Sequence, residues 1–256
     1  MMTQTHLVGT LDVTSLPTPA PELADFETDA WELGEIDVLH VNYEISANAI
    51  QSSVPPALHP SIPPHLSWLV YRVKDSSDGP FTLAQTRVGC RIGLKPRGLL
   101  LSAFCDNPDV GRQLRSRWGF DVRAGHLVVS KHADQIELRV RSAGRDILAL
   151  DVVDPTLLPG GAVPIAAGMN LARTPVGTRL VQVDPEYVIA SAERGKVKLH
   201  TFDAAAWGDP TIAPTWPISG SFIRAEVTLP RLRYLTDPTS TSADGTTRLP
   251  DPEAAR

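Results

Sequence analysis

The chain has 256 residues, of which 42% are hydrophobic, and a formal net charge of -5. This length can bury one sizeable core, and neither the net charge nor any cluster of basic residues fits a nucleic-acid-binding protein. No apolar run approaches the ~20 residues that cross a bilayer and the first residues do not resemble a signal peptide, so we expect a cytoplasmic protein without a membrane partner.

The two ends of the chain differ from its middle in composition. Residues 1–28 are polar and rich in proline, and residues 236–256 contain almost no apolar side chains to bury. We expect both ends to be flexible and residues 29–235 to form one domain. Deletion of residues 1–25 and 237–256 should then leave the thermal stability nearly unchanged.

Short runs of alternating and β-branched residues recur through residues 29–235 and predict β-strands. The predicted strands are 36–44, 67–74, 81–93, 99–105, 126–131, 136–140, 146–153, 179–183, 196–202 and 222–229. Many short strands separated by turn residues favour a mainly β fold with few helices, arranged as a sandwich, cone or barrel.

The clearest helix signal follows Asn107, which is a suitable N-cap, with Pro108 at the first helical position. Gly119 ends the pattern, and a shorter helix is expected around residues 47–53. The longer helix should pack on the sheet through residues spaced by four, namely Val110, Leu114 and Trp118.

The two cysteines, Cys90 and Cys105, fall on the arms of one predicted hairpin with its turn at residues 95–98. This placement favours two buried, reduced thiols over a disulfide.

Residues 106–125, DNPDVGRQLRSRWGFDVRAG, resemble a segment of acetoacetate decarboxylase-type enzymes. In those enzymes an Asp-Asn turn opens a short helix, and the loop after the helix presents two adjacent lysines. The resemblance extends to SSVPPALHP (52–60), GPFTLAQTRVGCRIG (79–93) and FIRAEVTLPRLRYL (222–235). It implies an acetoacetate decarboxylase-like β-cone or closed barrel that encloses a small-molecule cavity.

The resemblance places the family's imine-forming lysine at Val122 and its cationic neighbour at Arg123. The family's pocket acid falls near Leu83 and its arginine near Ile36. In such decarboxylases the lysine amine, its pKa lowered by an apolar pocket and an adjacent cation, forms an imine with a β-keto acid. Val122 has no nucleophile, so the imine route is closed at this position.

Other lysines offer little as replacements. Lys196 and Lys198 share one face of a strand, where a pair of like charges could lower one pKa, but a solvated sheet face is the favoured interpretation. His59 and His65 bracket a proline-rich loop whose spacing does not fit a metal pair. No nucleotide-binding or metalloprotease motif occurs, so we expect neither a metal nor a cofactor.

Two charged residues flank or replace the missing lysines. Arg123 is either a clamp for a carboxylate or enolate, or a surface arginine. Asp121 is either a general base or a turn residue. We predict catalytic roles for both. The predicted ligand-binding residues are Leu83, Gln85, Phe120, Val122 and Arg123.

Gln85, Arg87 and Arg91 share one face of a predicted strand. Because a face that carries arginines usually contacts water, exposure of this face is the favoured interpretation.

Three functions of different classes remain. The first is a lyase, hydratase or cyclase that acts without an imine on a keto acid or a polyketide-type carboxylate. The second is a catalytically inactive small-molecule-binding protein on the same scaffold, and the third is a structural subunit whose cavity is filled with bulky side chains. The sequence leaves open whether the chain forms a homo-oligomer.

Overall fold

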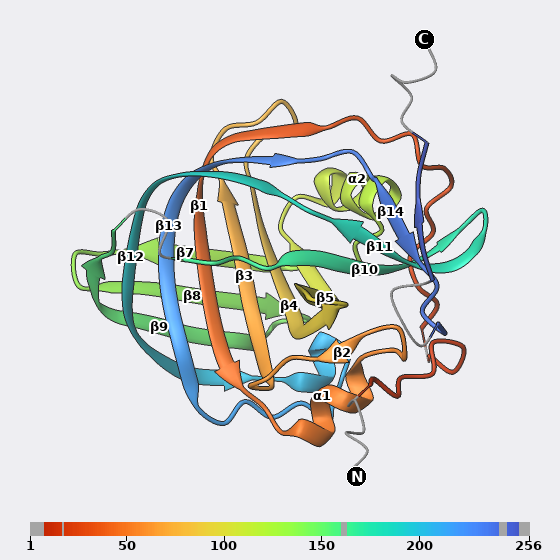
Figure 1. Cartoon of the computed structure of the whole chain (residues 1–256). Coiled ribbons are helices and arrows are strands. Elements are labelled where there is room, and N and C mark those ends of the chain that lie inside the picture. The colour runs from red at the N-terminus through yellow and green to blue at the C-terminus, as the bar shows by residue number, and fades with distance from the viewer. Residues whose placement is uncertain (1–7, 17, 160–162, 241–244, 251–256) are drawn as a thin grey trace.

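The computed structural model describes residues 8–16, 18–159, 163–240 and 245–250. Within these ranges one mixed sheet of 15 strands accounts for most of the structure (Figure 1). The strands are β1 (Trp31–Glu44), β2 (His59–Pro60), β3 (His65–Val73), β4 (Phe81–Ile92), β5 (Lys95–Cys105), β6 (Val122–Ala124), β7 (His126–Lys131), β8 (Gln135–Ser142), β9 (Arg145–Leu157), β10 (Ala167–Thr174), β11 (Gly177–Val183), β12 (Glu186–Phe202), β13 (Pro217–Leu229), β14 (Tyr234–Thr236) and β15 (Thr246–Arg248). The helices are α1 (Ala47–Ser53), α2 (Pro108–Trp118) and the short 3-10 helix η1 (Ala204–Trp207).

The sheet runs in the order β15-β14-β11-β10-β5-β4-β3-β1-β13-β12-β9-β8-β7, with β2 paired to β4 and β6 paired to β5. The prediction of a mainly β fold with few helices is confirmed. The strand order does not return to its start among the described residues, so the sheet is open and the closed barrel in that prediction is not formed. An enclosed cavity stays a prediction.

Apolar side chains form one cluster on each face of the sheet. In Figure 1, β7, β8 and β9 cross behind β1, β12 and β13, so the sheet folds over on itself. The first cluster, which includes Trp68, Leu138 and Leu150, lies between these two parts. The second cluster, on the other face of β1, β3 and β4, includes Val38 and Tyr71 and is covered by α2. Adjacent residues of β1 join different clusters because side chains alternate across a strand.

The α2 prediction is confirmed in detail. The Asn107 side chain accepts hydrogen bonds from the backbone N–H groups of Asp109 and Val110. Gly119 ends the helix with a φ of 67°, a left-handed conformation that glycine adopts without a steric penalty. The N-cap of α1 is Ser46, whose side chain accepts from the Ala49 N–H.

The β4–β5 hairpin turns earlier than predicted. Ile92 pairs with Lys95, so Gly93 and Leu94 form the turn, and residues 95–98 already belong to β5. Cys90 and Cys105 are nevertheless buried and free, which confirms the prediction of reduced thiols. Burial raises the pKa of each thiol to about 12, which keeps both protonated at neutral pH.

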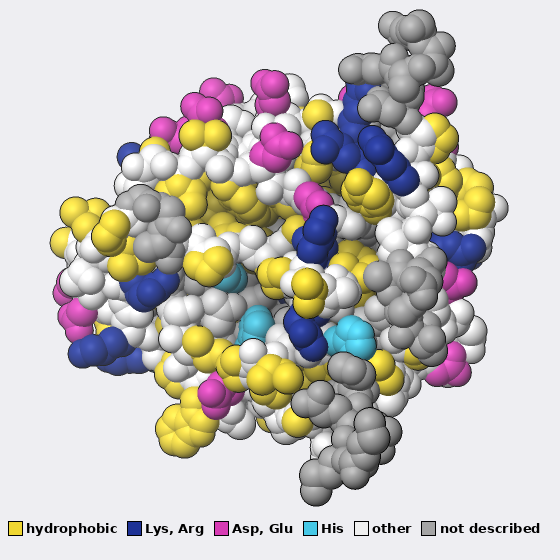
Figure 2. Space-filling view, in the orientation of Figure 1, with side chains coloured by type: hydrophobic (Ala, Val, Ile, Leu, Met, Phe, Trp, Pro, Cys, Tyr) yellow, Lys and Arg dark blue, Asp and Glu magenta, His cyan; other side chains and the backbone are white. Residues whose placement is uncertain are grey.

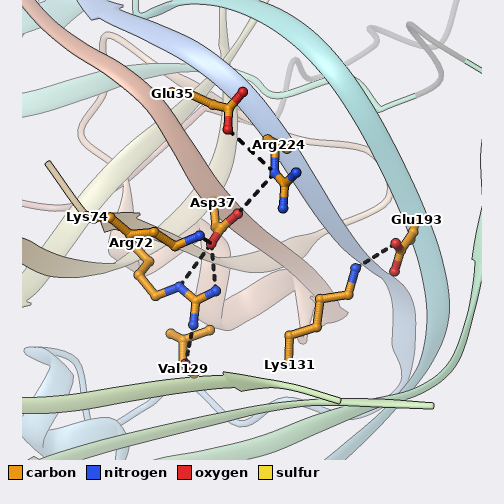
Figure 3. Close-up of polar contacts among 8 residues, drawn as sticks. All are labelled: Glu35, Asp37, Arg72, Lys74, Val129, Lys131, Glu193 and Arg224. Carbon is orange, nitrogen blue, oxygen red and sulfur yellow. Dashed lines mark hydrogen bonds and ion pairs between the residues drawn. The ribbon is translucent and has the colours of Figure 1, made fainter. Parts of the chain in front are cut away.

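A buried carboxylate joins four strands on the face of the first cluster (Figure 3). Asp37 of β1 accepts hydrogen bonds from Arg72 at 2.6 Å and forms an ion pair with Lys74 at 2.8 Å. Arg72 also donates to the Val129 carbonyl of β7 at 2.6 Å, and Arg224 of β13 approaches Asp37 at 3.7 Å. Although burial alone would raise the pKa of Asp37, the hydrogen bonds from Lys74 and Arg72 lower it overall.

Parts of both chain ends lie against the sheet. The Leu23 side chain is 1% exposed and belongs to the second cluster, and its N–H donates to the Arg173 carbonyl at 2.8 Å. Near the other end, Tyr234 of β14 pairs with Arg248 of β15. The boundaries at residues 28 and 236 stay predictions, but the polar composition of the ends did not indicate these contacts. No helix of the described ranges has the length and apolar character needed to span a membrane.

Candidate functional site

Two adjacent rows of side chains make one face of the sheet polar. In the first row, direct cross-strand partners run from Gln85 through Leu69, His40 and Ser221 to Arg194. Such partners lie on the same face of a sheet. The second row, one pleat further along, runs from Arg87 through Ser67 and Asn42 to Ser219. We call the polar members of both rows the polar face, namely His40, Asn42, Ser67, Gln85, Arg87, Arg194, Ser219 and Ser221.

The polar face borders the second apolar cluster. The next row in the other direction contains Leu83, Tyr71, Val38 and Ile223, all buried members of that cluster. Figure 2 shows the molecule hollowed near the middle of the view, with histidine side chains among apolar ones. The face therefore offers polar groups beside an apolar wall, as small-molecule sites commonly do.

Arg87 is the central charge of the polar face. Its side chain is 2% exposed, and its Nε and Nη2 atoms donate to the Gln85 Oε1 at 3.1 and 2.5 Å. Nη1 donates to the Ala166 carbonyl at 3.3 Å. Across the described ranges no carboxylate forms an ion pair with it. A permanently charged guanidinium that is buried against neutral acceptors favours an anion as a further partner.

Glycines on two strands make room for this guanidinium. A Cβ atom at Gly98 would lie 3.1 Å from Cδ of Arg87, and one at Gly168 would lie 3.5 Å from Nη2. The side chain is thus held between β5 and β10.

Gln85 contributes an unused donor next to Arg87. The side chain is fully buried, and while its Oε1 accepts from Arg87, its Nε2 makes no hydrogen bond of ordinary geometry, although it lies close enough to the Tyr71 hydroxyl to favour a lower pKa of that phenol. A buried amide without a partner costs free energy, which a bound acceptor would recover.

His40 supplies a neutral imidazole. It is 8% exposed, and burial, reinforced by electrostatic repulsion from Arg87 and other nearby basic groups, lowers its pKa to about 4. At neutral pH the ring therefore has one nitrogen free to accept a proton.

Two tyrosine hydroxyls meet at the edge of this face. The hydroxyl groups of Tyr71 and Tyr187 share a hydrogen bond, and their rings form an edge contact with centroids 6.4 Å apart. Burial raises the pKa of both phenols, so both remain protonated. One hydroxyl donates to the other, which leaves one proton of the pair to donate elsewhere.

Several residues predicted from the family resemblance lie on this side of the sheet. Leu83 and Ile36 are buried members of the second cluster. Val122 of β6 belongs to the same cluster and pairs with Ala103, which in turn pairs with Gln85, so Val122 extends the first row. Phe120 is buried in the cluster as well.

The two predicted catalytic residues lie elsewhere. Arg123 pairs with Phe104, a member of the first cluster, and its guanidinium carbon lies 4.8 Å from the centroid of the Phe104 ring. The Asp121 carboxylate forms an ion pair with Arg115 at 3.3 Å. Arg123 and Asp121 line a different pocket, together with Leu99 and Leu180. The catalytic roles predicted for them stay predictions, without support from the polar face.

All five lysines of the chain lie within the described ranges, and none belongs to the polar face. The side chain of Lys74 is 60% exposed in its ion pair with Asp37, and Lys131 pairs with Glu193 at 2.6 Å. The three others are exposed, namely Lys95, Lys196 and Lys198. The preference for a solvated face around the last two is confirmed. No group of three His, Cys, Asp or Glu side chains in the described part of the chain is arranged to hold a metal ion.

Sequence reasoning placed Gln85 correctly beside Arg87 but oriented their face wrongly, because Arg87 is buried rather than solvated. It missed His40, Tyr71 and Tyr187 as candidate site residues. A sequence signal for a polar face does exist in β1 and β4. Polar residues occur two positions apart inside otherwise apolar strands, in HVN (40–42) and in QTR (85–87). Tyr187 lies where the family resemblance is loose, and only the fold brings it to Tyr71.

No protein-family model and no curated protein sequence matches the chain. Solved structures do match it. Acetoacetate decarboxylase from Legionella pneumophila is 17% identical, with a TM-score of 0.67 over 90% of this chain and 97% of that one. The enduracididine biosynthesis enzyme MppR complexed with pyruvate is 18% identical, with a TM-score of 0.69 over 83% and 92%. An acetoacetate decarboxylase-like enzyme from Sphingomonas wittichii RW1 is 13% identical, with a TM-score of 0.61 over 94% and 98%. The chain therefore has the acetoacetate decarboxylase-like fold that the sequence resemblance predicted.

Proposed function

We propose that the protein binds a small keto acid on the polar face, with the carboxylate on Arg87, and promotes enolisation of the acid without an imine. The observation that carries this proposal is the Arg87 guanidinium, which is buried, faces only neutral acceptors and lies beside the unpartnered Nε2 of Gln85. A carboxylate would supply both the charge and the acceptors that these two side chains lack. A keto acid also agrees with the pyruvate bound by the structural neighbour MppR.

The arrangement of the remaining groups suits the removal of a proton next to a carbonyl. His40 lies two strands away from Gln85, which is ~10 Å at the usual strand spacing. Leu69 lies between them in the same row, so a small acid that contacts both would lie over the Leu69 side chain. In the proposed step the C–H bond breaks and the proton passes to the His40 imidazole. The C–H electron pair forms the C=C bond of the enolate, and the π pair of the carbonyl moves to its oxygen. Gln85 Nε2 and the pair of tyrosine hydroxyls are the donors near this oxygen.

Binding would also strengthen the base. The positive charge of Arg87 is one cause of the low pKa of His40. A carboxylate on Arg87 offsets this charge, so the pKa of His40 should rise towards the working pH when the acid is bound.

An imine has no support from the residues present. The sequence resemblance aligns the family's lysine with Val122, and the five lysines of the chain lie away from the polar face. We therefore favour a lyase, hydratase or cyclase that works through an enolate. The alternative is an inactive binding protein on the same scaffold, which would hold the acid but not exchange its protons.

Exchange of the methyl protons of pyruvate in D2O, followed by proton NMR, tests the proposal and separates the two functions. We expect the wild type to accelerate exchange, Arg87→Gln and His40→Gln to lose the acceleration, and Arg112→Gln, on the exposed side of α2, to retain it. Pyruvate binding without any exchange would favour the binding protein. Absence of both binding and exchange for pyruvate and for acetoacetate would contradict the proposal.

A further inference from the structure

A second pocket, of about 280 Å³, lies between the N-terminal part of the chain and strands β5, β10 and β11. Most of its floor consists of leucines that belong to the first apolar cluster or pack against it, namely Leu99, Leu101, Leu171 and Leu180. Leu100, a member of the second cluster that pairs with Arg87, completes the floor. The function proposed above makes no use of this pocket.

The described residues 9–16 and 18–23, which we call the strap, cross this pocket and are attached at both ends. At one end the Leu11 N–H donates to the Val54 carbonyl at 2.9 Å. At the other end the Arg173 N–H donates to the Pro21 carbonyl at 2.8 Å. The strap is therefore fixed on either side of the pocket.

Side chains of the strap alternate between the pocket and water. The apolar residues Leu11, Val13 and Leu16 are half-buried and line the pocket, whereas the polar residues between them are exposed. The strap thus forms an apolar roof over the apolar floor.

One cation at the rim of the pocket is available to a ligand. Arg123 lines the pocket and rests on the Phe104 ring, and in the described structure it has neither a hydrogen bond nor an ion pair. The other charges of the lining are engaged. Arg115 pairs with Asp121 at 3.3 Å, and Asp209 accepts a hydrogen bond from Ser53 at 2.5 Å.

We propose that this pocket binds a carboxylate with an alkyl chain, such as a medium-chain fatty acid. The alkyl chain would lie between the leucine floor and the strap, and the carboxylate would pair with the guanidinium of Arg123, which is suited to bidentate binding. The commitment to this ligand class rests on charge complementarity, because the lining is largely apolar and Arg123 is the one cation among its described residues that has no ion pair. Pockets of this kind are lined mostly by apolar side chains with a few polar groups that fix the ligand's orientation.

Isothermal titration of the full chain with octanoate, 1-octanol and acetate tests this inference. We expect octanoate to bind more tightly than either other compound, and Arg123→Gln to weaken octanoate about tenfold or more while leaving octanol unchanged. Arg112→Gln is the matched control on α2 and should bind octanoate like the wild type. Leu16→Asp, in the roof, should weaken both octanoate and octanol.

The variant Arg87→Gln distinguishes octanoate binding in this pocket from pyruvate binding on the polar face. It should bind octanoate normally, whatever happens to pyruvate. Loss of octanoate binding in Arg87→Gln would place the fatty acid on the polar face and overturn the inference. Equal affinity of wild type and Arg123→Gln for octanoate, or no binding of octanoate at all, would also overturn it.

Discussion

His40 is a titratable group that the fold keeps neutral. Burial and nearby positive charge lower its pKa from the ordinary 6.5 to about 4. The unfolded chain binds this proton more readily than the folded chain does. The free energy of unfolding should therefore be fully maintained above pH 6.5 and fall as the pH drops from 6.5 towards 4.

The first prediction concerns this pH dependence. Between pH 7 and pH 4.5, His40→Gln should lose less stability than the wild type, by an amount that does not exceed about 3 kcal/mol. Urea unfolding at the two pH values measures the difference. Identical losses in both proteins would mean that the His40 imidazole is accessible to water and titrates normally.

A second prediction concerns Val122, the position to which the resemblance assigns the family's lysine. Val122 is 7% exposed, and its methyl groups lie near Gly111 of α2. In Val122→Lys the new amine should have a pKa lowered by ~1 to 4 units because of desolvation. Arg123 should contribute little, since it stacks on Phe104, a member of the cluster on the other face.

Trapping with borohydride checks that prediction. Val122→Lys incubated with pyruvate or acetoacetate should gain the mass of a reduced imine, while the wild type should keep its mass. An adduct on the wild type would reveal an active lysine elsewhere. A lysine at position 122 that traps nothing would show that this position does not reach a ligand.

Arg87 illustrates the limit of sequence reasoning at the scale of residues. The alternation in β4 identified which residues share a face, because that property depends only on neighbours in the sequence. Whether the face meets water depends on β10 and on glycines at positions 98 and 168 that lie close to Arg87 only in the folded chain. A local sequence pattern does not indicate contacts of this kind.

At the scale of elements, the carboxylate of Asp37 holds β1, β3 and β13 together and orders Arg72 for its bond to β7. Asp37→Asn should lower the free energy of unfolding by about 1 to 3 kcal/mol, because it removes charge-assisted hydrogen bonds from a buried position. Glu35→Gln is the control. The Glu35 side chain is 63% exposed, so this substitution should leave the free energy of unfolding nearly unchanged. If Asp37→Asn leaves the free energy of unfolding unchanged, these strands are held by backbone pairing and apolar packing alone.

The elements that the sequence predicted are those with strong local signals. The α2 helix has a capping asparagine, a first-turn proline and a terminal glycine, and each of the ten predicted strands overlaps an observed one. Strand β10, the short strands β2, β6, β14 and β15, and the first half of β12 were missed. Residues 186–195 of β12 are mostly exposed or half-buried, so they lack the apolar alternation that marks a strand.

At the scale of the whole molecule, the chain ends matter more than their composition suggests. Leu23 is a core residue in a polar, proline-rich segment. Leu23→Ala should lower the free energy of unfolding by about 2 to 4 kcal/mol, as for other buried leucines, and deletion of residues 1–25 should cost at least as much. Glu22→Ala is the neighbouring control, since its carboxylate is 72% exposed. Unchanged melting temperatures for Leu23→Ala and the deletion would restore the original expectation that this end is dispensable.

The central claim is that a buried, unpaired Arg87 binds the carboxylate of a small keto acid, and the affinity of the protein for pyruvate tests it most directly. Isothermal titration should show that Arg87→Gln weakens pyruvate binding about 10- to 150-fold, which corresponds to the loss of a charge-assisted pair worth ~1.5 to 3 kcal/mol. Arg112→Gln and Arg123→Gln should bind pyruvate like the wild type. Unchanged affinity in Arg87→Gln, or a loss confined to Arg123→Gln, would contradict the account and move the keto-acid site away from the polar face.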